Sequence, residues 1–297
     1  MKVKTTKRRV EVKKISIMFL LVLALSFVSC SQAETGDGKQ QTEDKKTVEA
    51  GSTSPRQTGA SQEVSDEEMA DEEKQARAEQ LAAATTEAFK ILKDKRDEYS
   101  SKINTAKAAY DALGTAPLRT QDKVEIPGGI TDFTKAKDQP KFHASLGYDN
   151  KTIENLNKSI DGLSHDGKID DLGRKTTVNG IFNLLVSLED ATKKILDTHL
   201  SDENLKKIEN NKDKIEKATA ELKEFITSRD DFIAGIKKSI EASVDQKATS
   251  DDAKAELDKI IAKTSSTSST KAGDAGYLHS KVEAVKNNEK VLSGLFN

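Results

Sequence analysis

The sequence predicts an all-α protein, an elongated bundle of about five to six helices that follows a disordered N-terminal tether. Three observations support this prediction. Apolar residues recur at alternating spacings of three and four, which places them on one face of a helix. Only four prolines occur, and none follows Pro140, so the last 157 residues contain no such helix breaker. No segment combines alternating apolar residues with the β-branched density of a strand.

The N-terminal segment has the pattern of a bacterial lipoprotein signal peptide. Seven basic residues lie among residues 1–14, an apolar run covers residues 15–28, and Ser29 precedes Cys30, the only cysteine of the chain. The run is shorter than the roughly 20 residues that a membrane-spanning helix needs. We therefore expect residues 1–29 to be a signal peptide that is cleaved between Ser29 and Cys30. Several acyl chains on Cys30 would then anchor the protein to a membrane.

Residues 30–65 are expected to form a lipidated, disordered tether. Val48 and Val64 are the only large apolar side chains after Cys30 in this segment, too few to offset the entropy lost on ordering. A flexible coil of this length has a root-mean-square span of about 30–35 Å. Removal of residues 1–29 would leave 41 basic and 49 acidic residues, and most of the excess negative charge lies between residues 31 and 80.

Residues 66–297 are expected to form the helical bundle domain. A long helix is predicted over residues 66–113, because Gly114 and Pro117 then provide stop signals. The apolar face of this helix is predicted to consist of Leu81, Ala88, Leu92, Tyr99, Ile103, Ala106, Tyr110 and Leu113. Shorter helices are predicted around residues 152–163 and 177–200. Another is expected to open at Ser250 and to be broken by the Ser/Thr run at residues 264–270, and a last helix is expected to hold the apolar residues from Tyr277 to Leu295.

The clearest periodic pattern begins after Ser201, a favourable N-cap that Asp202 and Glu203 follow in the first turn. Eight of the eleven positions in the ladder that follows are apolar; the ladder is Leu205, Ile208, Lys212, Ile215, Thr219, Leu222, Ile226, Arg229, Ile233, Ile236 and Ile240. We expect one continuous helix of about 40 residues, about 60 Å long. Its three polar positions favour packing in a bundle over a simple parallel coiled coil.

Residues 114–150 form the irregular part of the domain. They contain three of the four prolines and the pair Gly128-Gly129. A connection of this length without structure is unusual, so we expect a short helix near residues 131–137. Long loops often carry binding function. We favour the simpler interpretation, in which the loop crosses one end of the bundle and inserts Phe133 and Phe142 into it.

No motif predicts catalysis, and we expect neither an enzyme nor a cofactor or metal. The chain has no Gly-x-Ser-x-Gly motif, no phosphate-binding glycine loop and no thiol besides Cys30. No two of its four histidines have the spacing that places both on one helical face. Residues 165–170 resemble part of a calcium loop, but Gly162 and Gly173 would occupy its first and last ligand positions. We expect an Asp/Gly turn between helices there.

Five lysines form the only candidate partner-binding cluster: Lys206, Lys207, Lys212, Lys214 and Lys217. Glu209, Asp213 and Glu216 lie among them at salt-bridge spacing, which favours a self-neutralised helix face over a site for a sulfated glycan. From residue 81 onwards, 35 basic and 36 acidic residues nearly balance. This balance argues against binding of nucleic acid.

Taken together, these features resemble the outer-surface lipoproteins of Borrelia spirochaetes. The shared features are the Phe-Val-Ser-Cys segment that ends at Cys30, a polar tether, and a Lys- and Asn-rich helical domain without Trp or disulfides. The resemblance is closest to the helical antigen groups, either S2-antigen-like or of the complement-regulator-binding type. It implies lipidation at Cys30, display on the outer membrane and binding of a host or vector macromolecule. No binding residue of those groups matches a position here.

We therefore expect a non-enzymatic, lipid-anchored surface protein of the outer membrane. Its expected role is that of an adhesin or immune-evasion module that binds a host extracellular-matrix or complement protein. A structural surface-coat antigen and a periplasmic helical lipoprotein of the envelope remain as alternatives. Apolar residues left exposed along the helix at 205–240 would favour the surface-coat alternative, which includes oligomers.

Overall fold

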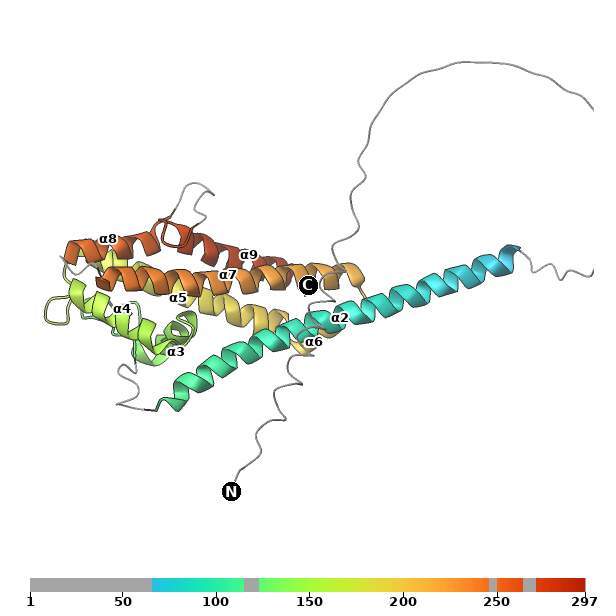
Figure 1. Cartoon of the computed structure of the whole chain (residues 1–297), viewed down its shortest axis with the longest axis horizontal. Coiled ribbons are helices and arrows are strands. Elements are labelled where there is room, and N and C mark those ends of the chain that lie inside the picture. Colours follow the sequence, from blue (N-terminus) through green and yellow to red (C-terminus); the bar gives the residue numbers. More distant parts are fainter. Residues whose placement is uncertain (1–65, 115–122, 246–249, 264–270, 297) are drawn as a thin grey trace, which may run out of the picture. The chain divides into compact units, whose positions relative to one another are not determined.

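The computed structural model describes residues 66–114, 123–245, 250–263 and 271–296, and every regular element among them is helical (Figure 1). The all-α class is therefore confirmed. The helices are α2 (Asp66–Ala112), α3 (Lys135–Ser145), α4 (Asn150–Leu163), α5 (Leu172–Lys193), the π-helical segment η1 (Lys194–His199), α6 (Asp202–Lys206), α7 (Lys212–Asp245), α8 (Ser250–Ile261) and α9 (Tyr277–Phe296). The predicted signal peptide, lipidation site and tether lie outside the described residues.

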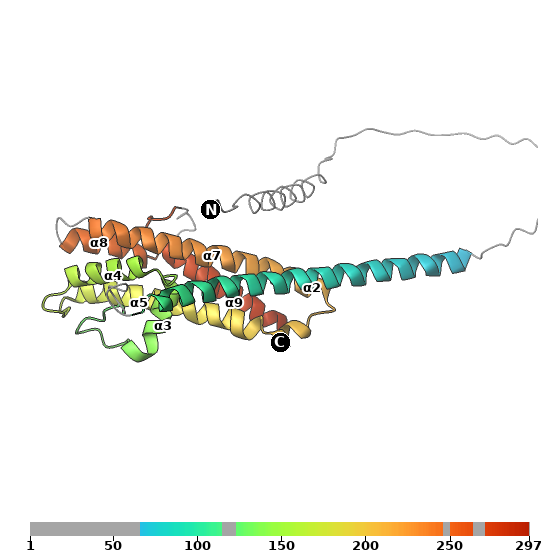
Figure 2. The same ribbon diagram turned by 60° about the horizontal axis from the view of Figure 1, so that its bottom comes forward.

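Two helices organise the core. Helix α7 packs against α9, α8, α2 and α4, and helix α5 packs against α3, α8 and α9 (Figure 2). The core that these helices enclose contains four fully buried phenylalanines: Phe142, Phe182, Phe225 and Phe232. None of the described helices has the length and apolar character that spanning a bilayer requires.

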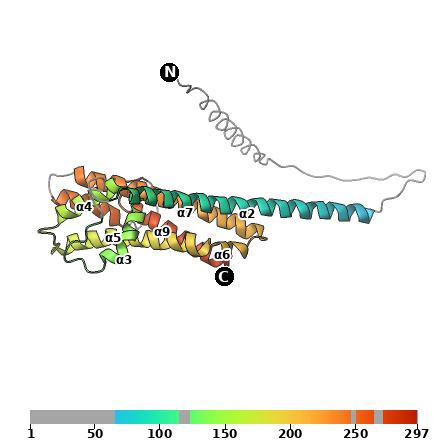
Figure 3. The same ribbon diagram turned by 90° about the horizontal axis from the view of Figure 1, so that it is seen from below.

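Helix α2 runs alongside α7 and confirms the predicted long helix, but its apolar face is shorter than predicted (Figure 3). Leu92, Tyr99 and Tyr110 are buried, whereas Leu81 is 56% exposed, so its placement on the inner face was wrong. Every side chain from residue 71 to residue 84 is exposed. The periodic pattern continues there, but no described helix packs against it, and good helix formers sustain the helix without burial.

The long helix predicted after Ser201 is interrupted. Ser201 does act as an N-cap, since its Oγ accepts a hydrogen bond from the Asn204 amide at 3.3 Å. Helix α6 nevertheless ends at residue 206, and α7 starts at residue 212 after Asn211, whose side chain accepts from the Lys214 amide at 3.0 Å. Asparagine side chains compete with helical backbone bonds and favour such caps. The prediction of one continuous helix was wrong, although the apolar ladder positions are all buried or half-buried.

The helix predicted at residues 177–200 begins earlier and changes its pitch. Asp171 caps α5 by accepting a hydrogen bond from the Arg174 amide at 2.8 Å. The last turn is π-helical, and the Leu200 amide donates to the Ile195 carbonyl, five residues back, at 2.9 Å. This wider turn buries Ile195 and Leu196 side by side against the core.

The predicted irregular loop contains a longer helix than expected. Helix α3 replaces the short helix predicted at residues 131–137, and it continues through Pro140. Phe142, on this helix, stacks on Phe182 at 4.7 Å between ring centroids and lies 5.9 Å from Phe133. This aromatic packing compensates for the hydrogen bond that proline removes. The interpretation that the loop inserts Phe133 and Phe142 into the bundle is confirmed.

The segment at residues 165–168 forms the predicted Asp/Gly turn. Asp166 and Gly167 both adopt positive φ, 50° and 71°, as a type I′ turn requires. His165 and Lys168 exchange two backbone hydrogen bonds, at 2.8 and 3.0 Å. Gly128 joins this turn through a bond of 2.8 Å to the Gly167 carbonyl, so the two irregular segments support each other.

Candidate functional site

The structure describes the lysine cluster but not the predicted lipidation site. Ser29 and Cys30 lie outside the described residues. Lys206 is the last residue of α6, and Lys207 lies in the turn that follows. The other three lysines, Lys212, Lys214 and Lys217, belong to the first turns of α7, so all five lie near the N-terminal end of α7. Of these, Lys206, Lys207 and Lys217 are exposed.

The remaining two lysines have internal partners. Lys214 donates to the Leu295 carbonyl near the end of α9 at 2.8 Å, and Lys212 lies 3.6 Å from Glu216 on its own helix. Lys214 therefore stabilises the end of α9, where unpaired carbonyls attract a cation. Of the five predicted lysines, three are exposed and the other two are half-buried.

A buried charged centre lies at the middle of α7, and the sequence analysis treated its key residue only as an interruption of the ladder. Arg229 is 3% exposed. Its guanidinium donates to the Ala144 carbonyl of α3 at 3.0 Å and to the Tyr99 hydroxyl of α2 at 3.2 Å. It also lies 4.0 Å from Glu189 on α5. One side chain thus joins four helices.

Tyr99 continues this network to the surface. Its hydroxyl donates to Asp230 Oδ1 at 2.8 Å, and Lys102 binds Asp230 Oδ2 at 2.6 Å. Burial raises the pKa of Tyr99 to about 12. The phenol therefore stays protonated at physiological pH, so it accepts from Arg229 and donates to Asp230 at the same time.

Glu189 is the titratable member of the centre. Burial raises the pKa of its carboxyl to about 7, although Arg229 and Lys193 favour the charged form. Its Oε2 has no hydrogen-bond partner among the described residues, and the same holds for Nε of Arg229. The charge of this pair therefore changes close to neutral pH.

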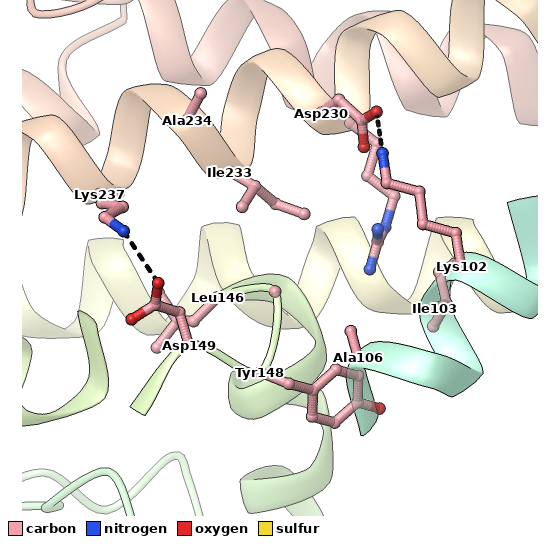
Figure 4. A pocket seen from close by; sticks show the side chains of 12 residues that line it. Lys102, Ile103, Ala106, Leu146, Tyr148, Asp149, Asp230, Ile233, Ala234 and Lys237 are labelled. Atoms are coloured by element: carbon pink, nitrogen blue, oxygen red, sulfur yellow. Dashed lines mark hydrogen bonds and ion pairs between the residues drawn. The ribbon is translucent and has the colours of Figure 1, made fainter. Parts of the chain in front are cut away.

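A cavity of about 390 Å³ adjoins the charged centre, between α2, the α3–α4 turn and α7 (Figure 4). Apolar side chains from all three elements line it, among them Ile103, Leu146 and Ile233. Two ion pairs lie at opposite ends of the cavity: Lys102 with Asp230, at 2.6 Å, and Lys237 with Asp149, at 2.9 Å. The cavity is thus apolar along its length and charged at its ends.

The α3–α4 turn forms one wall of this cavity. Gly147 and Tyr148 both have positive φ, 68° and 58°, and the second is unusual for a tyrosine. A Cβ on residue 147 would lie 3.0 Å from Ile233 Cγ2, so the close approach and the positive φ both favour glycine there. Asp149 caps α4 by accepting from the Thr152 amide at 2.9 Å.

The electrostatics of this wall follow from the same contacts. Burial alone would raise the pKa of Asp149, but hydrogen bonds from Lys237 and Thr152 lower it below its ordinary value. Asp149 is therefore charged at physiological pH, and its pairing with Lys237 ties the turn to α7. In the described residues, no group of three or more His, Cys, Asp or Glu side chains is placed to hold a metal ion.

Sequence reasoning missed Arg229, Glu189 and the cavity. The sequence does contain one signal. Arg229 occupies a position on the apolar face of a long helix, and a charged side chain on such a face is expected to be buried with the apolar residues around it. Its partners come from helices distant in sequence, so the periodic pattern did not reveal them.

The fold and this site define the chain as an all-α helical-bundle protein with a buried charged centre and an adjoining apolar cavity. No protein-family model matches the chain, and a comparison with curated proteins finds no match.

Proposed function

We propose that this chain is a lipid-anchored bacterial surface protein that binds a host extracellular-matrix or complement protein and is not an enzyme. The observation that carries the proposal is the position of Cys30. The only cysteine follows a basic segment, an apolar run and Ser29, as in lipoproteins that are acylated after cleavage. Acyl chains there would hold the helical domain to the outer membrane, at the end of a polar segment of some 35 residues.

The surface of the described domain is compatible with a broad, charge-based interface. Three exposed lysines lie near the N-terminal end of α7: Lys206, Lys207 and Lys217. The stretch of α2 from residue 71 to residue 84 is also exposed, on every face of the helix. Charged rims steer encounter and select partners more than they add affinity. We assign these three lysines as the first positions to test for partner contact.

The surface-coat alternative has less support. Apolar residues exposed along α7 would have favoured it, but the apolar positions of that ladder are buried or half-buried. The large apolar side chains that are exposed in the described domain are Leu81, Ile91 and Leu172. The periplasmic alternative is tested by protease treatment of intact cells, because only a surface-exposed chain is cut.

The binding proposal is tested with the full chain carrying Cys30→Ser, immobilised and exposed to host plasma and to purified matrix proteins. We expect a partner that binds with micromolar or better affinity. The variant K206Q/K207Q/K217Q should bind at least tenfold more weakly and lose most of the salt dependence. A matched variant, K90Q/K95Q/K107Q on the part of α2 that follows residue 84, is the control for loss of charge alone. A broad screen without any partner contradicts the proposal.

The anchoring proposal is tested separately by mass spectrometry of the protein from its native membrane. We expect a product that begins at Cys30 and carries acyl chains. An unmodified Cys30 thiol, or a product that retains residues 1–29, contradicts lipidation.

A further inference from the structure

The cavity between α2, the α3–α4 turn and α7 has features that the proposed macromolecular binding does not explain. Its apolar wall comes from Ile103, Ala106, Leu146 and Ile233, on three separate elements. Its volume of about 390 Å³ lies within the range of small-molecule sites in proteins. An apolar cavity of this size with a few polar groups is suited to a small amphiphile.

The side chains that line the cavity include three cations and two carboxylates. Lys102 is neutralised by Asp230, and Lys237 by Asp149. Arg229 also contributes to the lining, but it has no carboxylate within hydrogen-bond distance, because its nearest, Glu189, is 4.0 Å away. The residues that line the cavity therefore carry a net charge of +1, and the carboxyl nearest to Arg229, that of Glu189, lies outside the lining. This balance favours an anion over a cation.

Arg229 also retains unused hydrogen-bonding capacity. Its Nε has no partner among the described residues although the side chain is almost fully buried. A buried donor of a charged group that has no partner destabilises the protein. Proteins keep such groups mainly where a ligand or a mechanism uses them.

The backbone that forms the cavity wall is strained. Tyr148 adopts φ of 58°, a conformation that non-glycine residues rarely occupy and that is concentrated at ligand sites. In this conformation its ring lies at the edge of the cavity beside Ala106 of α2 (Figure 4). The strain thus places an aromatic side chain where it would cover a bound apolar body.

We propose that this cavity binds a small amphiphilic monoanion, a carboxylate with a medium-length aliphatic chain such as that of octanoate. The aliphatic body lies against Ile103, Leu146 and Ile233, and the Tyr148 ring covers it. The carboxylate lies at the end of the cavity formed by Lys102 and Arg229. There Lys102 offsets the charge of Asp230, and Arg229 supplies the positive charge for the bound carboxylate.

The test uses calorimetric titration of the full chain carrying Cys30→Ser with octanoate, octanol and octylammonium at pH 7. We expect one octanoate per chain, and binding at least tenfold weaker for the neutral and the cationic analogues. Ala106→Trp places a large ring in the cavity and should weaken octanoate binding at least tenfold. Ala109→Trp adds the same ring on the exposed face of α2 and should leave the affinity within twofold.

These variants also separate the cavity from the apolar run at residues 15–28, since octanoate bound to that run would be insensitive to Ala106→Trp. If the Ala106→Trp variant loses the circular dichroism of a helical protein, a second measurement tests whether octanoate lies in the cavity. This measurement is the detection of nuclear Overhauser effects between the Tyr148 ring and the octanoate methylenes in the protein with Ala106 intact. Equal affinity for octanol, unchanged binding by a folded Ala106→Trp variant, or absence of both binding and such effects overturns the proposal.

Discussion

Glu189→Gln is expected to remove most of the pH dependence of stability between pH 5 and pH 8. The carboxyl of Glu189 has a pKa of about 7 in the folded protein, against an ordinary value of 4.5. Below pH 4.5 both folded and unfolded chains bind the proton, and Glu189 costs nothing. Between pH 4.5 and pH 7 the unfolded chain releases its proton while the folded chain keeps it, so the stability falls steadily as the pH rises. Above pH 7 the folded chain also releases its proton, and the loss is complete.

The magnitude follows from the difference between the two pKa values. At about 1.4 kcal/mol for each pKa unit, the loss approaches about 3 kcal/mol once the pH is well above 7. Glutamine keeps the volume and carries no charge at any pH, so the variant should resemble the wild type at pH 5 and be more stable at pH 8. Asp149, whose pKa is lowered, titrates below this window and does not obscure the effect.

Urea denaturation followed by circular dichroism at several pH values measures this effect. Glu216→Gln, an exposed position on α7, is the matched control and should retain the wild-type pH dependence. Parallel stability curves for the wild type and Glu189→Gln from pH 5 to pH 8 would refute the reasoning, as would a variant that is less stable than the wild type at pH 8.

Three further substitutions test the packing and the turns, each by the free energy of unfolding in urea. Phe182→Ala should cost about 3–5 kcal/mol, because the ring is fully buried against a second phenylalanine, whereas Leu172→Ala, 78% exposed, should cost less than about 0.5 kcal/mol. Gly147→Ala should cost more than about 1 kcal/mol because φ is positive and the new Cβ meets α7; Gly162→Ala, with free space around it, should be neutral or stabilising. Ser201→Ala should cost about 1 kcal/mol through loss of the α6 cap, and a value near zero contradicts the capping role.

The helical periodicity predicted burial better than it predicted where helices end. On α2 it identified Leu92, Tyr99 and Tyr110 correctly, since a 3-4 spacing marks a face whatever lies opposite. It failed at Leu81 because burial also needs a partner surface, and no described helix packs on that part of α2. The break before Lys212 was missed because side-chain caps from asparagine interrupt a helix without disturbing its apolar spacing.

In the irregular segment at residues 114–150, the predicted helix is too short rather than too long. The short helix predicted near residues 131–137 stops before Pro140, whereas α3 continues through that proline. The buried contacts of Phe142 and the amide of Gln139, which exchanges hydrogen bonds of 2.8 and 2.6 Å with Val124, hold this region in place. Such contacts join residues from different parts of the chain, and local propensity does not encode them.

Local spacing and composition are enough to predict the helical class and most of the apolar faces, and both are confirmed. The same kind of local pattern predicts the anchor at Cys30, which stays a prediction. Only the tertiary structure decided that Arg229, Glu189 and Tyr99 meet, and that a cavity lies beside them. The physical reason is that a buried charge acquires its pKa, its partners and its unused hydrogen-bonding capacity from helices that are distant in the chain. Those properties arise when the helices pack, and no single segment carries them.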